Sequence, residues 1–120
     1  NKNYFKDKIK KFNNKKFTIW GDGTARRELI YVEDACTLML KLLNRDNEIF
    51  NLGGGKDHSI NEFAKYVCEG FDYNYDLIER DLTKYVGVKS KLLNIDKISD
   101  YKLTPLNKGL ERTIDWYKNK

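Results

Sequence analysis

The chain has 120 residues, of which 40% are hydrophobic and 13% aromatic. This length allows one domain with a core and excludes two ordinary domains, while the composition excludes intrinsic disorder. The formal net charge is +5, but residues 1–16 alone hold seven lysines and one aspartate, so the rest of the chain is close to neutral. The basic character is therefore local, which favours a solvated helix face over a surface that binds nucleic acid.

Cysteine and histidine usage gives no sign of a disulfide framework or a metal site. Cys36 and Cys68 lie far apart in the chain, and His58 is the single histidine. Neither cysteine has a second Cys or a His at the spacing of zinc ligands. We therefore expect two buried, reduced thiols and no bound metal.

Hydropathy and the start of the chain bear on its setting. No apolar run approaches the length of about 18 residues that a membrane span needs, and no signal-like start is present, so we expect a soluble, cytoplasmic protein. The chain begins at Asn1 within a helical pattern, because Phe5, Ile9 and Phe12 recur at helical spacing. That start suggests a fragment of a longer protein.

Strand and helix patterns alternate along the rest of the chain. Asp34 is placed to cap the first apolar helical stripe, and Ser59 with Glu62 has the spacing of a capping box before the second. Thr104-Pro105 starts the last helix, since proline is tolerated in a first helical turn. The expected strands are 17–20, 29–32, 48–52, 75–79 and 91–95, and the expected helices are 35–43, 60–70 and 105–117. This alternation predicts an α/β fold.

Two sequence patterns are similar to known catalytic or cofactor-binding motifs, but neither matches such a motif well enough to predict that role. Gly53-Gly54-Gly55 stands between a strand and a helix, but position 58 is His where a dinucleotide fingerprint needs its third glycine. We interpret it as a sharp turn, and His58 as a turn residue. Tyr4 with Lys8 and Tyr85 with Lys89 have the spacing of a tyrosine–lysine dyad, but such pairs arise by chance in a chain this rich in both residues.

The residues that could bind a ligand are most concentrated between Trp20 and Asp34. Arg26 and Arg27 follow a Gly-Asp-Gly turn close to Trp20. A planar guanidinium can bind two phosphate oxygens, and an indole can stack on a base or a sugar. An anion bound there would need a second cation, which Lys91 could supply. Exposed arginines near a turn are also commonly solvent contacts, so composition leaves both readings open.

The order of the motifs resembles the extended short-chain dehydrogenases/reductases. Residues 20–34, read as Trp-Gly-Asp-Gly-Thr-Ala-Arg-Arg-Glu-Leu-Ile-Tyr-Val-Glu-Asp, are similar to that family's Trp-Gly-x-Gly-Thr-x-x-Arg-Glu-Phe-x-x-Val-Asp-Asp motif. Residues 50–55, 59–63 and 110–117 follow in the family's order. Within the family the chain most resembles the GDP-L-fucose synthases. The resemblance covers nearly all 120 residues.

The resemblance implies roles for three residues. Trp20 and Arg27 would line the nucleotide-sugar site, and Lys91 would contact the nucleotide portion. It also implies that Asp34 is a helix cap. The chain departs from the family in the loop 85–94, where only Gly87 and Lys91 match the characteristic residues of the family's loop. It also has Tyr31 at a position where His is common in the family. These departures leave the sugar open, so a heptose or another deoxyhexose is allowed.

The resemblance further implies that residues 1–120 are a C-terminal substrate-binding region, roughly the last two-fifths of an enzyme. The dinucleotide fingerprint, the catalytic Ser or Thr and the Tyr-x-x-x-Lys dyad would belong to a missing N-terminal Rossmann core. That core would bind NADP, so the fragment would hold neither cofactor nor catalytic residues. The whole enzyme would be a homodimeric GDP-sugar epimerase/reductase without nucleic-acid or membrane partners. The alternative is a freestanding module that binds nucleic acid or an acidic partner through its basic start.

Overall fold

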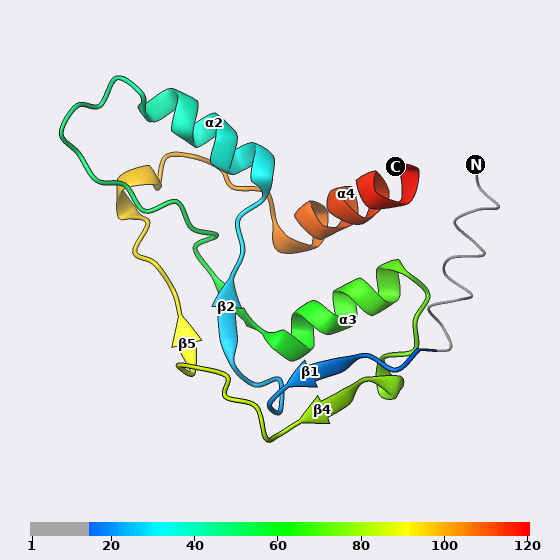
Figure 1. Cartoon of the computed structure of the whole chain (residues 1–120). Coiled ribbons are helices and arrows are strands. Elements are labelled where there is room, and N and C mark those ends of the chain that lie inside the picture. Colours follow the sequence, from blue (N-terminus) through cyan, green and yellow to red (C-terminus); the bar gives the residue numbers. More distant parts are fainter. Residues whose placement is uncertain (1–14) are drawn as a thin grey trace.

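The computed structural model describes residues 15–120, in which short strands alternate with helices (Figure 1). The helix expected around Phe5, Ile9 and Phe12, on which the alternative function depends, lies outside these residues. The α/β class is confirmed. The elements are β1 (Thr18–Trp20), β2 (Arg26–Glu28), α2 (Val32–Leu42), β3 (Asp57–Ser59), α3 (Ile60–Gly70), β4 (Glu79–Asp81), β5 (Ser90–Lys91) and α4 (Leu106–Asn119), with 3₁₀ turns at Tyr75–Leu77 and Asp96–Ile98.

Strand β2 is the centre of a small sheet in which β3 and β5 are its neighbours. It pairs antiparallel with β3 and parallel with β5. Strands β1 and β4 form a separate parallel pair, in which Trp20 lies opposite Asp81. The Gly21 amide extends this pair by donating to the Asp81 carbonyl at 2.8 Å. The turn between β1 and β2 therefore joins the two sheets.

Local sequence signals explain α3. The Glu62 amide donates to Ser59 Oγ at 3.1 Å, and the Ser59 amide donates to Glu62 Oε2 at 2.7 Å, so the expected capping box is confirmed. Helix α3 also ends at Gly70 as expected. Helix α4 lies beside its C-terminal half, where the rings of Phe71 and Tyr117 meet edge to face with centroids 5.8 Å apart. Lys118 Nζ donates to the Gly70 carbonyl at the same contact.

Asp34 does not cap α2, so that prediction is wrong. The N-cap position belongs to Tyr31, and Asp34 lies in the first turn, 6% exposed. Its carboxylate instead accepts hydrogen bonds from Thr104 N at 2.7 Å, Thr104 Oγ1 at 3.1 Å and Tyr101 Oη at 3.2 Å. The side chain therefore fastens the start of α2 to the segment that leads into α4.

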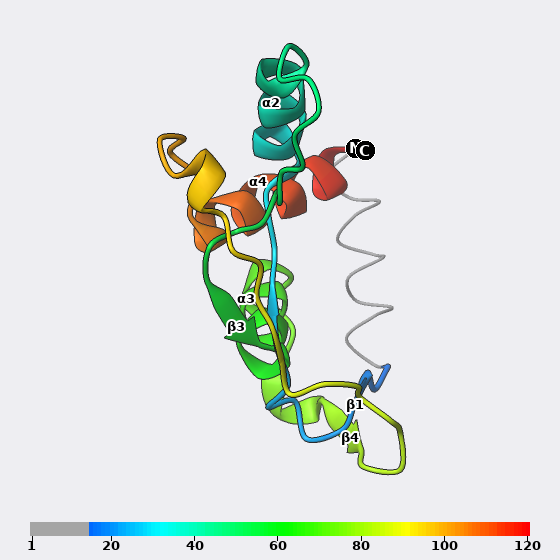
Figure 2. The same ribbon diagram turned by 90° about the vertical axis from the view of Figure 1, so that its left-hand side faces the viewer.

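The described part of the molecule is thin, with extents of 51 × 40 × 18 Å, as Figure 2 shows from the side. Its buried apolar residues are few and scattered over several elements: Ala25, Leu38, Cys68, Ile98 and Ile114. Helix α2 leaves apolar side chains in solvent, namely Val32, Met39 and Leu40. Within residues 15–120, no helix is long and apolar enough to cross a bilayer.

The strand predictions are partly wrong. Residues 17–20 form β1 as expected, but residues 29–32 are not a strand, because the pairing lies one segment earlier, at the polar residues of β2. Residues 48–52 have no strand partner and are irregular. The expected strand 75–79 is mostly a 3₁₀ turn before β4, and that at 91–95 shortens to β5. Cys68 is buried as expected, whereas Cys36 is exposed.

Candidate functional site

The turn from β1 to β2 depends on two glycines and one aspartate. Gly21 and Gly23 have φ values of 72° and 76°, a left-handed conformation that favours glycine. Asp22 Oδ1 accepts from Thr24 N at 2.8 Å and from Thr24 Oγ1 at 2.7 Å, and these bonds lower the pKa of Asp22. Asn61 Nδ2 donates to the Asp22 carbonyl at 3.0 Å. The start of α3 thus holds the turn that carries Trp20 and β2.

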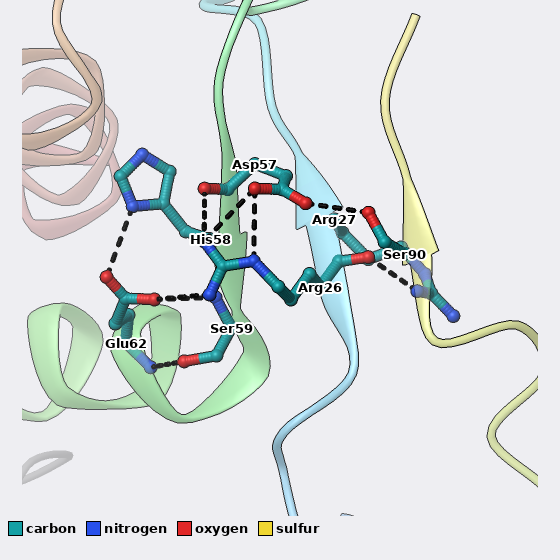
Figure 3. Close-up of polar contacts among 7 residues, drawn as sticks. All are labelled: Arg26, Arg27, Asp57, His58, Ser59, Glu62 and Ser90. Atoms are coloured by element: carbon teal, nitrogen blue, oxygen red, sulfur yellow. Dashed lines mark hydrogen bonds and ion pairs between the residues drawn. The ribbon is translucent and has the colours of Figure 1, made fainter.

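Arg26 belongs to an internal network rather than to an open anion site (Figure 3). Its Nε donates to Asp57 Oδ1 at 3.0 Å and its Nη2 to the Asp57 carbonyl at 2.9 Å. Ser90 Oγ donates to Asp57 Oδ2 at 2.7 Å. These bonds, first from Ser90 and then from Arg26, hold the pKa of Asp57 below its usual value. Asp57 thereby joins all strands of the central sheet.

Glu62 completes this network at the start of α3. Its Oε2 lies 3.7 Å from Arg26 Nη1, and its Oε1 lies 3.4 Å from His58 Nδ1 (Figure 3). The Ser59 backbone and side-chain hydrogen bonds, with His58 next, lower the pKa of Glu62 to about 2. His58 lies in β3 with its ring 5.9 Å from that of Phe63, so it packs within the protein. Nothing in this arrangement points to a catalytic histidine.

Arg27 lies next to Arg26 and so points to the opposite side of β2. Its Nη1 donates to the Val88 carbonyl at 3.0 Å and to the Arg26 carbonyl at 2.6 Å. Its Nη2 donates to the Val86 carbonyl at 2.9 Å. The guanidinium therefore holds backbone on both sides of Gly87, whose φ is 73°. The side chain is half-buried.

The structure brings together two of the three predicted substrate residues. Arg27 and Lys91 are direct partners in the parallel pairing of β2 with β5, so two cationic side chains start from adjacent backbone positions. Lys91 is exposed. Trp20 stands apart, on β1, and is 62% exposed, so its indole is open to a ligand. The binding roles of all three residues stay predictions.

The triple glycine serves packing rather than phosphate binding. A Cβ on Gly53 would lie 2.6 Å from Glu28 Oε2, and one on Gly54 would strike the Leu29 carbonyl. Glu28 also accepts from Leu93 N at 2.7 Å and from Gly55 N at 3.3 Å. The glycines therefore approach the end of β2, and α3 starts only after β3. This turn does not fit a nicotinamide dinucleotide, so no step of a reaction through such a cofactor follows from it.

Sequence reasoning missed the residues that position this site. Asp57 and Ser90 carried no motif, and the residues that they bind, Arg26 and Asp57, lie more than 30 positions away in the chain. Asn61 lies within the family-like segment 59–63, but that segment gave no sign of its bond to the Asp22 carbonyl, 39 positions away. Glu28 could have been noticed, because it follows Arg27 within the family motif. Within residues 15–120, no group of three His, Cys, Asp or Glu side chains could hold a metal ion.

Known proteins resemble this chain over most of its length. Residues 2–53 match the NAD dependent epimerase/dehydratase family. The chain is 30% identical to GDP-L-colitose synthase of Yersinia pseudotuberculosis, over 84% of its own length and 34% of that protein's. It is 33% identical to GDP-L-fucose synthase of Azorhizobium caulinodans, over 83% of its own length and 34% of that protein's. Other relatives are named for UDP-glucose and for a dTDP-sugar.

The same fold occurs in a solved structure. A GDP-L-fucose synthetase from Naegleria fowleri superposes with a TM-score of 0.83 over 99% of the chain and 39% of that protein, at 20% identity. The chain spans about a third of the length of the curated relatives it matches. It is thus related, in sequence and in fold, to the NAD-dependent epimerase/dehydratase family of extended short-chain dehydrogenases/reductases.

Proposed function

We propose that residues 1–120 are the C-terminal, nucleotide-sugar-binding region of an NADP-dependent GDP-sugar epimerase/reductase. Its substrate would be a GDP-4-keto-6-deoxyhexose or a related GDP-heptose. The observation that carries the proposal is the register of β2 and β5, which pairs Arg27 with Lys91. The relatives named for GDP-sugars support the choice of base.

The chemistry of the three residues fits a nucleoside diphosphate sugar. A guanidinium can grip two oxygens of a diphosphate, and the Lys91 ammonium would neutralise further charge beside it. The exposed Trp20 indole offers a flat apolar face for the organic part of the ligand. In this division of labour the region binds and orients the substrate, which lowers the entropic part of the barrier.

The chemical step would belong to the rest of the enzyme. A nicotinamide cofactor, bound outside residues 1–120, would supply hydride to the 4-keto sugar, and a tyrosine there would act as general acid. The exposed apolar face of α2, with Leu40 70% and Val32 63% exposed, supports a larger protein, because contiguous apolar surface usually meets a partner. We further propose that the whole enzyme is a cytoplasmic homodimer.

Titration of GDP into the protein, followed by calorimetry, tests the binding role. We expect Lys91→Ala to weaken GDP binding about ten-fold, because one charge-assisted contact contributes about 1.5 kcal/mol or more. Lys102→Ala is the matched control, since Lys102 is also exposed and lies in the segment that leads into α4. Equal GDP affinity in the wild type and in Lys91→Ala would contradict the proposed site. Tighter binding of UDP or dTDP than of GDP would instead correct the base.

A further inference from the structure

The segment 82–89, which links β4 to β5, lies against the turn between β1 and β2. A Cβ on Gly21 would be 2.6 Å from Val86 Cγ1, so glycine allows this close approach. The Arg26 amide donates to the Lys89 carbonyl at 2.7 Å. Apart from these contacts the segment is exposed, with Tyr85 87% and Val88 52% accessible. We call residues 82–89 the β4–β5 loop.

Arg27 fastens the middle of the β4–β5 loop. Because Gly87 is left-handed, the carbonyls of Val86 and Val88 converge on one guanidinium. Val88 accepts from Nη1 and Val86 from Nη2, and we infer that both carbonyls use the terminal edge of the guanidinium, which these two nitrogens form. The second Nη1 hydrogen is used by the Arg26 carbonyl. Two of these three acceptors, the carbonyls of Val86 and Val88, belong to the loop, so Arg27 is the side chain that holds its middle, between the Gly21 contact and the Lys89 hydrogen bond.

Within residues 15–120, Nε of Arg27 donates no hydrogen bond. A guanidinium has five N–H donors, and the three hydrogen bonds described leave Nε–H and one Nη2 hydrogen. Neither has an acceptor among residues 15–120. These two hydrogens form the lateral edge of the guanidinium, and they are parallel, which suits two oxygens of one phosphate group. The loop and an anion therefore need not compete for Arg27.

We propose that Arg27 couples the β4–β5 loop to anion binding: its terminal edge holds the loop while its lateral edge binds the diphosphate. The ligand in this inference rests on the proposed function. Coupling is reciprocal, so an ordered loop must raise the affinity for the anion by the same factor by which the anion stabilises the ordered loop. Arg27 is thus a positioning residue as well as a ligand contact, because the loop it fixes leads directly into Lys91.

Hydrogen exchange of peptides covering residues 82–91, with and without GDP, tests the coupling. Gly87→Ala is the decisive variant, because it keeps the guanidinium and strains only the backbone: its Cβ would meet nothing closer than Arg27 Nη2 at 3.7 Å. Arg27→Lys keeps the positive charge but loses the planar guanidinium, whose two terminal nitrogens donate to the two loop carbonyls. Asn47→Ala is the matched control, since Asn47 also has a positive φ, 58°, and lies outside the loop.

We expect faster exchange across the loop in ligand-free Gly87→Ala and Arg27→Lys, and wild-type exchange in Asn47→Ala. GDP should slow exchange in the wild type, and Gly87→Ala should bind GDP about five-fold more weakly, the effect of a left-handed alanine. Two results would overturn the coupling alone: GDP affinity unchanged in Gly87→Ala, or loop exchange indifferent to bound GDP. A wild type that binds no GDP would overturn the proposed function and this inference together.

Discussion

Replacing Asp34 by alanine should remove three hydrogen bonds that connect α2 to the segment before α4. Asp34 is 6% exposed, and its carboxylate accepts three hydrogen bonds, two from Thr104 and one from Tyr101. A hydrogen bond to a charged group contributes about 1.5–3 kcal/mol, and the hydroxyls of Tyr101 and Thr104 can turn toward water once the carboxylate is gone. The net loss should therefore be about 3 kcal/mol, mostly from the stranded Thr104 amide.

Thermal unfolding followed by circular dichroism measures this loss. For a chain of this size, 1 kcal/mol corresponds to about 4 °C, so Asp34→Ala should lower Tm by about 12 °C. Glu33→Ala is the matched control on the same helix turn: Glu33 is exposed and lies 3.8 Å from Arg112 Nη1. Its effect should stay within about 0.5 kcal/mol. If the two variants lost the same stability, the account of Asp34 as a connector would be refuted.

Two further outcomes follow from pKa values and burial. The folded pKa of Glu62, about 2, lies below its ordinary value of 4.5, so the stabilisation from this carboxylate is present above pH 4.5 and is lost as the pH falls toward 2. Glu62→Gln should flatten that part of the stability profile in urea titrations at several pH values; an unchanged slope would contradict it. Cys36 should react with a thiol reagent in the native protein, whereas Cys68, buried and with its pKa raised by burial, should react only on unfolding. Equal native rates, read by mass spectrometry, would be the contrary result.

The helices were predictable because their signals are local. The stripe of Leu38 and its neighbours, and the capping box of Ser59 and Glu62, lie within a few residues of each other. The strands were predictable only in part, because a strand is defined by a partner that is distant in sequence: residues 17–20 form β1 as expected, but other expected strands do not form. The apolar run 29–32 looked more like a strand than Arg26–Glu28, yet only the latter pairs with β3 and β5.

The residues of the candidate site, too, were predictable only where their signals are local in the sequence. Sequence could choose Arg27 and Lys91 by their chemistry and by resemblance, and the register then places them side by side. Sequence could not assign Arg26, because its partner Asp57 comes from another strand. The two arginines are neighbours of the same chemical type, so only the alternation of faces along β2 separates the Asp57 network of Arg26 from the contacts of Arg27 with Val86 and Val88.

The parallel register of β2 and β5 limits how this chain can vary in length. Successive residues of a strand face opposite sides of the sheet. A shift of β5 by one residue along β2 would therefore place the side chains of Ser90 and Lys91 each on the opposite face. Asp57 would lose its hydroxyl donor, and the lysine would leave the side of Arg27. Natural insertions or deletions between β4 and β5 should therefore change only the length of the loop before Lys89. The order Ser90-Lys91 should be kept, because it fixes the register of β5 against β2.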